Sequence, residues 1–170
     1  MQNHWMKRVT PSRLFEAHVT VTDLDVSARF YEDMVGLQPA YRLDARRVAF
    51  FWIGGPGHTM LGVWEGGTAP NRMQIHVAFA CERDDVLGAP VRLRTRGIEP
   101  LGFNGEPSAE PVVIGWMPAV AVFFRDPDGH LLEFIAMLPD AARPDVGVVP
   151  YSTWMSLAQN RAHASPKNQQ

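Results

Sequence analysis

The stretch from residue 14 to residue 37, LFEAHVTVTDLDVSARFYEDMVGL, decides the fold because two periodicities follow one another in it. Its first part alternates apolar and polar side chains, which is typical of a β-strand with one buried face. The second part predicts a helix, because Asp23 or Asp25 can cap its start and Gly36 can end it. The apolar stripe predicted for this helix consists of Val26, Phe30, Met34 and Leu37.

The same order of elements recurs further along the chain. Three strand-like runs, PAYRL, RVAFFWI and TMLGVWE, follow the helix, and the glycine-rich turn GGPGH joins the last two. A second copy has the strand MQIHVAFA, the helical segment ERDDVLGAPVRLRTRG, the strand IEPLGF and an irregular piece around VVIGWM. It closes with AVAVFFRD and HLLEFIAM around a Pro-Asp-Gly turn.

This duplication predicts an α+β fold of two tandem βαβββ modules that form a concave mixed sheet around a metal or substrate cavity. The alternative is one irregular α+β domain whose halves resemble each other by accident. We expect an N-terminal arm over residues 1–12 and the duplicated domain over 13–138, with halves at about 13–68 and 72–138. A C-terminal extension, 139–170, has a flexible last ten residues and otherwise packs on a sheet edge or a partner subunit.

Composition excludes several classes of protein. The chain has 170 residues, of which 46% are hydrophobic and 20% charged, as expected for a globular domain. Sixteen basic and eighteen acidic residues give a net charge of -2 without a basic block, which argues against a nucleic-acid partner. No apolar run is long enough for a membrane span or a signal peptide. Because the lone Cys81 cannot form an internal disulfide, we expect a cytoplasmic protein.

Strand alternation also assigns side chains to the two faces of the sheet. On the opening strands, the apolar residues face the helices, whereas His18 and His76 lie on the opposite face. Pairing Arg125 with His130 across the second turn predicts that Glu133 shares the face of the two imidazoles. The same pairing rule gives the predicted wall of a small-molecule pocket, which consists of Phe50, Trp52, Leu61, Val63, Val122, Phe124 and Ile135.

Two imidazoles and one carboxylate on one face predict a metal site. His18 and His76 occupy equivalent places in the two copies, and Glu133 lies on the closing strand of the second copy. Such a 2-His-1-carboxylate set suits one divalent Fe, Mn, Zn or Ni ion and leaves positions open for substrate oxygens. Taken alone, each of these residues is also explained as a hydrogen-bonded or solvated side chain that binds no metal. Further candidates are Thr20 and Glu16 as catalytic groups and Gln74 as a substrate contact, whereas His58 and His130 are expected to face solvent.

The quoted segments resemble the vicinal oxygen chelate superfamily, which contains glyoxalase I, bleomycin-resistance proteins, fosfomycin-resistance thiol transferases, methylmalonyl-CoA epimerase and extradiol dioxygenases. The resemblance is carried by HVTVTDLDVSARFYEDMVGL, MQIHVAFA and FFRDPDGHLLEF, and it covers Leu14 to about Leu138. It implies paired βαβββ modules around a metal cavity, a small-molecule substrate and a homodimer. His18, His76 and Glu133 match the positions of the family's ligands.

Departures from the family pattern bear on the reaction. Glyoxalase I and the epimerase have a fourth ligand, Glu or Gln, on the closing strand of the first half, where the turn register puts Leu61. The expected site is therefore more similar to the three-ligand fosfomycin-resistance and extradiol types. The other residues that those enzymes use, a basic cluster or an acid–base His and Tyr, have no clear counterpart in this sequence. We expect a metal-dependent lyase, isomerase, thiol transferase or extradiol-type dioxygenase that chelates two oxygens of a small, largely apolar molecule. The alternative is a non-catalytic sequestering protein of the bleomycin-resistance type.

Overall fold

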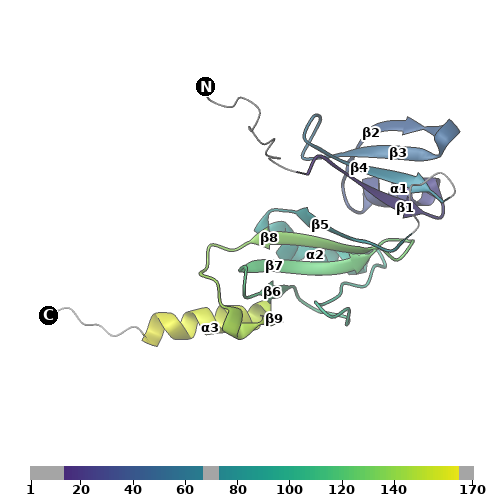
Figure 1. The fold of residues 1–170 in the computed structure, drawn as a ribbon. Helices are drawn as coiled ribbons and strands as arrows, with labels where there is room; N and C mark the ends of the chain where they lie inside the picture. Colours follow the sequence, from purple (N-terminus) through teal and green to yellow (C-terminus); the bar gives the residue numbers. More distant parts are fainter. Residues whose placement is uncertain (1–13, 67–72, 165–170) are drawn as a thin grey trace, which may run out of the picture. The chain divides into compact units, whose positions relative to one another are not determined.

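The computed structural model describes residues 14–66 and 73–164, with side chains up to residue 158. The predicted arm over residues 1–12 and the final residues 165–170 lie outside this description. The chain divides into two compact units, one up to Met73 and one from Gln74 onward (Figure 1). No helix in the described ranges is long and apolar enough to cross a membrane.

Unit 1 is a four-stranded mixed sheet with one helix. The strand order is β1-β4-β3-β2, with β1 parallel to β4 and the other pairs antiparallel. The helix packs on β3 and β4. Its elements are β1 (Glu16–Val21), α1 (Leu24–Asp33), β2 (Gln38–Leu43), β3 (Val48–Ile53) and β4 (Thr59–Glu65).

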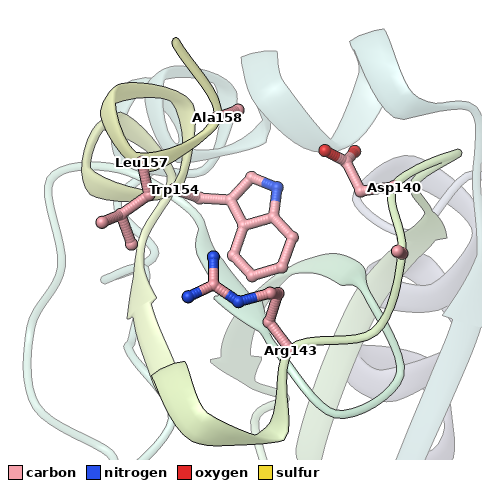
Figure 2. Close-up of a pocket in the computed structure, with 6 residues that line it drawn as sticks. Asp140, Arg143, Trp154, Leu157 and Ala158 are labelled. Atoms are coloured by element: carbon pink, nitrogen blue, oxygen red, sulfur yellow. The ribbon is translucent and has the colours of Figure 1, made fainter. Parts of the chain in front are cut away.

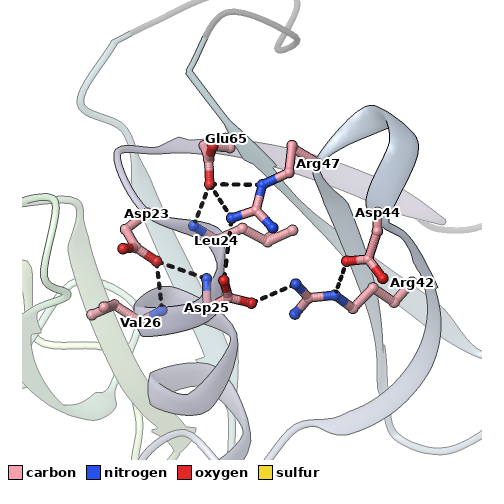
Figure 3. Close-up of polar contacts among 8 residues, drawn as sticks. All are labelled: Asp23, Leu24, Asp25, Val26, Arg42, Asp44, Arg47 and Glu65. Atoms are coloured by element: carbon pink, nitrogen blue, oxygen red, sulfur yellow. Dashed lines mark hydrogen bonds and ion pairs between the residues drawn. The ribbon is translucent and has the colours of Figure 1, made fainter.

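The cap of α1 decides which of its faces is buried. The Asp23 carboxylate accepts the backbone N–H groups of residues 25 and 26 at 2.9 and 3.0 Å, which starts the helix at Leu24 (Figure 3). The buried side chains are then Leu24, Ser27 and Tyr31. The predicted stripe was wrong in part, because Val26 is 43% exposed.

A charged network ties the start of α1 to the end of β4 (Figure 3). The Glu65 carboxylate accepts the Leu24 backbone N–H at 2.9 Å and the Arg47 Nε–H at 3.1 Å. Arg47 and Arg42 both pair with Asp25. The bond from Arg47 holds the pKa of Glu65 below its usual value, and the bonds from Arg42 and Arg47 do the same for Asp25.

Unit 2 repeats this arrangement and adds to it. Its strand order is β5-β8-β7-β6-β9, with β5 parallel to β8 and the other pairs antiparallel. Helix α2 packs on β7 and β8. The two units therefore confirm the predicted α+β class and the tandem βαβββ modules. The elements are β5 (His76–Ala80), α2 (Arg83–Thr95), β6 (Val112–Ile114), β7 (Ala119–Arg125), β8 (Leu131–Met137), β9 (Val148–Pro150) and α3 (Tyr151–Ala164).

Two segments of unit 2 differ from the sequence expectation. The run IEPLGF forms only isolated bridges through Leu101, whereas VVI, expected to be irregular, is the regular strand β6. The C-terminal extension uses the edge of the sheet, because β9 pairs with β6. Glu110 then holds the start of α3, since its carboxylate accepts the N–H and the hydroxyl of Ser152 at 2.9 and 2.8 Å. The helix continues to Ala164, into the tail predicted to be flexible.

Both hairpins have loops of five residues, one more than the predicted pairing allows. Arg125 pairs with Leu131 rather than His130, because the Asp126 side chain accepts the N–H groups of residues 128 and 130 and closes a wider turn. In the first hairpin, Ile53 pairs with Thr59. A shift of one residue turns every side chain of one strand to the other face. The wall residues placed on the wrong face by the prediction are Leu61, Val63, Val122 and Phe124.

Candidate metal centre

His18 lies in an aromatic corner of unit 1. Its ring stacks on Trp64 with centroids 5.6 Å apart, and Phe50 meets it edge-on at 6.1 Å. Its Nε2 atom is 3.1 Å from a carboxylate oxygen of Glu16 on the same strand face. Gly62 stands directly opposite His18, and a Cβ there would lie 3.0 Å from the imidazole. The absence of a side chain at residue 62 therefore leaves the ring its space.

The remaining unit 1 candidates divide between the two faces. Thr20 follows His18 by two residues on the same face and is mostly buried, and Phe50 and Trp52 share that face as predicted. Leu61 and Val63 are fully buried on the opposite face, the one that α1 covers. These two residues therefore do not line a surface that contains His18.

His76 and Glu133 meet in unit 2, so the prediction that they share a face is confirmed. The His76 Nε2 atom is 2.9 Å from Glu133 Oε2, although the two residues are 57 positions apart. Glu133 is only 5% exposed, and its Oε1 atom has no hydrogen-bond partner among the described residues. Burial raises the pKa of Glu133, and the neighbouring His76 opposes this effect.

The surroundings of this pair correct the predicted wall. Phe123 stands opposite Glu133, and its ring centroid is 6.1 Å from that of His76. Ile135 lies on the same face as Glu133, as predicted. Val122 and Phe124 are fully buried on the face that packs against α2, so they do not line the site.

Two polar side chains near the second turn make hydrogen bonds to the backbone at that turn. The Gln74 side chain donates to the Asp128 carbonyl at 3.5 Å, so its amide lies against the β7–β8 loop. His130 was expected to face solvent but is only 1% exposed, because its Nδ1 atom accepts the Ile75 N–H at 3.2 Å inside the turn. His58, in the first turn, is exposed as expected.

The donor atoms in unit 2 fit a divalent metal. A buried carboxylate oxygen without a partner is costly, and a cation bound to it removes that cost. An imidazole nitrogen and a carboxylate oxygen are ligands that Fe, Mn, Zn and Ni all accept. Within either unit, the described residues hold no group of three His, Cys, Asp or Glu side chains that could bind a metal. The His76–Glu133 pair thus needs at least one further ligand from outside unit 2 or from solvent.

The internal repeat shows what replaces a fourth ligand. His18 and His76 open equivalent strands, and two residues further along, Thr20 pairs with Trp64 while Ala78 pairs with Glu133. Trp64 therefore occupies in unit 1 the place that Glu133 occupies in unit 2, and the assignment of Leu61 to that place was wrong. The indole is mostly buried, and its Nε1 atom has no hydrogen-bond partner among the described residues. Sequence reasoning missed both Trp64 and Phe123 because the hairpin register was shifted.

A family comparison agrees with this geometry. The family described as the Glyoxalase/Bleomycin resistance protein/Dioxygenase superfamily matches residues 13–134. The chain belongs to this superfamily. Members of the glyoxalase superfamily commonly use a divalent metal ion, bind small molecules and often form dimers. A comparison with curated proteins found no match.

Several solved structures are similar to the chain. An integron cassette protein from the mobile metagenome of the Halifax Harbour sewage outfall is 32% identical, covers 75% of this chain and all of its own, and has a TM-score of 0.63. A glyoxalase/bleomycin resistance protein/dioxygenase from Nocardioides is 24% identical over 81% and 91% of the two chains, with a TM-score of 0.58. Lactoylglutathione lyase from Agrobacterium tumefaciens is 24% identical over 74% and 94%, with a TM-score of 0.57.

Proposed function

We propose that the chain is a metal-dependent enzyme whose ion is held by His18, His76 and Glu133. The observation that carries the proposal is the buried Oε1 atom of Glu133, which has no hydrogen-bond partner among the residues that the structure describes. The other carboxylate oxygen of Glu133 lies 2.9 Å from the His76 imidazole. His18 is the repeat-equivalent imidazole, and we propose that it supplies the third ligand. A divalent ion bound there supplies Lewis-acid chemistry, because it polarises two adjacent substrate oxygens and stabilises negative charge on them.

The polar residues near His18 have separate roles in this proposal. A carboxylate oxygen of Glu16 lies 3.1 Å from His18 Nε2, so Glu16 places a negative charge beside the proposed ion. The same carboxylate can accept a proton from a substrate bound beside His18. Thr20 offers a hydroxyl on the same face as His18, where it can donate to a substrate oxygen.

The aromatic residues define the substrate class. Phe50 and Trp52 on the His18 face, and Phe123 on the Glu133 face, give surfaces that bind apolar groups and exclude water. We therefore propose a small, largely apolar substrate that offers two adjacent oxygens. Since Trp64 stands where a fourth carboxylate ligand would stand, a reaction that needs a proton-transfer base at that place is disfavoured.

Metal identity separates the remaining reaction types. The protein is purified anaerobically, supplemented with Fe, Mn, Zn or Ni, and analysed for the metal that it retains. Retention of Fe or Mn together with substrate-dependent oxygen uptake supports an extradiol-type dioxygenase. Retention of Zn or Ni without oxygen uptake supports a lyase, isomerase or thiol transferase.

The sequestering alternative predicts a different result. If the supplemented protein holds less than about a tenth of an equivalent of every ion, the metal proposal fails. The hydrophobic faces then bind a small molecule without chemistry, as in a drug-sequestering protein. We also propose a homodimer, which size-exclusion chromatography with light scattering tests directly.

A further inference from the structure

A cavity of about 180 Å³ lies in the C-terminal extension of unit 2, beyond the residues that the family matches (Figure 2). We propose that this cavity is a second binding site, for a small neutral polyol up to the size of a monosaccharide. The family module does not account for it, because β8 ends before its first lining residue. The residues that line it are Asp140, Ala141, Arg143, Trp154, Leu157 and Ala158.

The indole N–H of Trp154 is a donor that no residue in the described part of the chain accepts. Trp154 is only 4% exposed, and its Nε1 atom has no hydrogen-bond partner among the described residues. Buried indole N–H groups usually have an acceptor, because leaving one unpaired costs free energy. In Figure 2 the nitrogen side of the ring is directed toward the Asp140 carboxylate across the cavity. An acceptor atom of a bound molecule would satisfy this group.

The other two polar side chains are also available to a ligand. Asp140 is exposed, and none of the described residues hydrogen-bonds to its carboxylate. Arg143 uses Nε and Nη2 to bind Asp145, at 3.1 and 2.8 Å, so Nη1 still has hydrogens to donate. The cavity therefore presents one strong acceptor and two kinds of donor.

The segment that carries these groups is held by its backbone. The Arg143 N–H donates to the Gly115 carbonyl at 2.6 Å, and the Gly115 N–H donates to the Gly147 carbonyl at 2.7 Å. A Cβ at residue 115 would clash with the Arg143 carbonyl oxygen, so only glycine permits this approach. The wall formed by Arg143 is thus positioned independently of any ligand.

Charge and hydrogen bonding select the class of ligand. Asp140 and Asp145 outnumber the single guanidinium, so the cavity has no excess positive charge to hold a carboxylate or phosphate. An ammonium can donate to Asp140 but cannot accept from the Trp154 N–H. A hydroxyl group does both. The volume far exceeds what a single water needs, yet it is smaller than the pockets that bind drug-sized molecules.

The test follows the indole N–H of Trp154 by two-dimensional ¹⁵N NMR of the full chain. The chain has five Trp residues, so the Trp154→Phe variant identifies the signal, and triple-resonance assignment replaces it if that variant does not fold. Glycerol and D-glucose are titrated, with acetate as the anionic comparison. We expect a saturable shift of the Trp154 signal with a polyol, no saturable shift with acetate, and loss of the polyol response in Asp140→Ala.

Matched variants make the result specific to this cavity. Glu99→Gln, which neutralises an exposed carboxylate elsewhere in unit 2, should keep the polyol response, and Glu133→Gln should keep it as well. The proposal is overturned if neither polyol gives a saturable shift, if acetate alone does, or if Asp140→Ala responds like the unaltered protein.

Discussion

Replacement of Glu133 by Gln should have opposite effects on the stability of the metal-free and the metal-loaded protein. In the metal-free state, the carboxylate is 5% exposed, and one of its oxygens has no hydrogen-bond partner within the described ranges. A buried unsatisfied group of this kind costs roughly 1–3 kcal/mol. Gln has the same shape and no charge, so the metal-free variant should be at least as stable as the unaltered protein.

The metal-loaded state should show the reverse. A ligand present at about 100 times its dissociation constant adds about 2.7 kcal/mol to the free energy of unfolding. For a chain of this size, that is a rise in melting temperature of roughly 5–10 °C. Glu133→Gln loses one of three ligands, and its rise should be less than half as large.

The assay is thermal unfolding followed by circular dichroism, with and without the ion that the protein retains best. Glu99→Gln is the matched control, because its carboxylate is exposed in the same unit and lies 3.6 Å from Arg94. It should behave like the unaltered protein in both states. The reasoning is refuted if Glu133→Gln destabilises the metal-free protein by more than about 1 kcal/mol, or if the ion stabilises this variant fully.

Three further predictions concern unit 1. Gly62→Ala places a Cβ 3.0 Å from His18, so calorimetric titration should show weaker metal binding. Gly66→Ala, whose Cβ would make only an ordinary contact at 3.7 Å, should bind the metal normally. Equal metal affinities of the two variants would contradict the role of the close approach. Leu61→Ala should lower the free energy of unfolding by about 2–5 kcal/mol without changing metal affinity, because this side chain faces α1. Weaker metal binding in this variant would show that the observed register of β4 is wrong. The two carboxylates bonded to Arg47 have pKa values below normal when folded, so they stabilise the protein above their unfolded pKa values and lose this effect as the pH falls. Urea unfolding between pH 3 and pH 7 should therefore depend less steeply on pH in Arg47→Ala, and an unchanged slope would contradict the network.

The sequence alone was sufficient to predict the main helices and strands and the duplicated order in which they occur. Strand alternation around His18 and His76 placed both imidazoles on the polar faces of their strands, and the two glycine-containing turns marked both hairpins. These features are local, so a single sequence reveals them. The family resemblance, carried by the same segments, is confirmed over residues 13–134.

The errors came from tertiary details that local patterns do not fix. The Asp126 side chain closes a five-residue loop, and this one extra residue moved Val122 and Phe124 to the helix-covered face. It also buried His130, which looked like an exposed turn residue. Asp126, at the start of the second loop, was the signal that could have suggested the wider turn there.

The role of Trp64 could not be read from spacing either. It became visible only when the pairing of β1 with β4 was compared with that of β5 with β8. The comparison requires the register of both sheets, and a shift of one residue replaces Trp64 by a neighbour on the other face.

The proposal that His18 binds the ion together with His76 and Glu133 is tested most directly by counting the metal ions retained per chain. Unaltered protein, His18→Ala and His58→Ala are loaded with the preferred ion, desalted and analysed for their elements. The account predicts about one ion per chain in the unaltered protein and in His58→Ala, and a large loss in His18→Ala. Full retention by His18→Ala would contradict it, since the imidazole of unit 1 would then play no part in holding the ion.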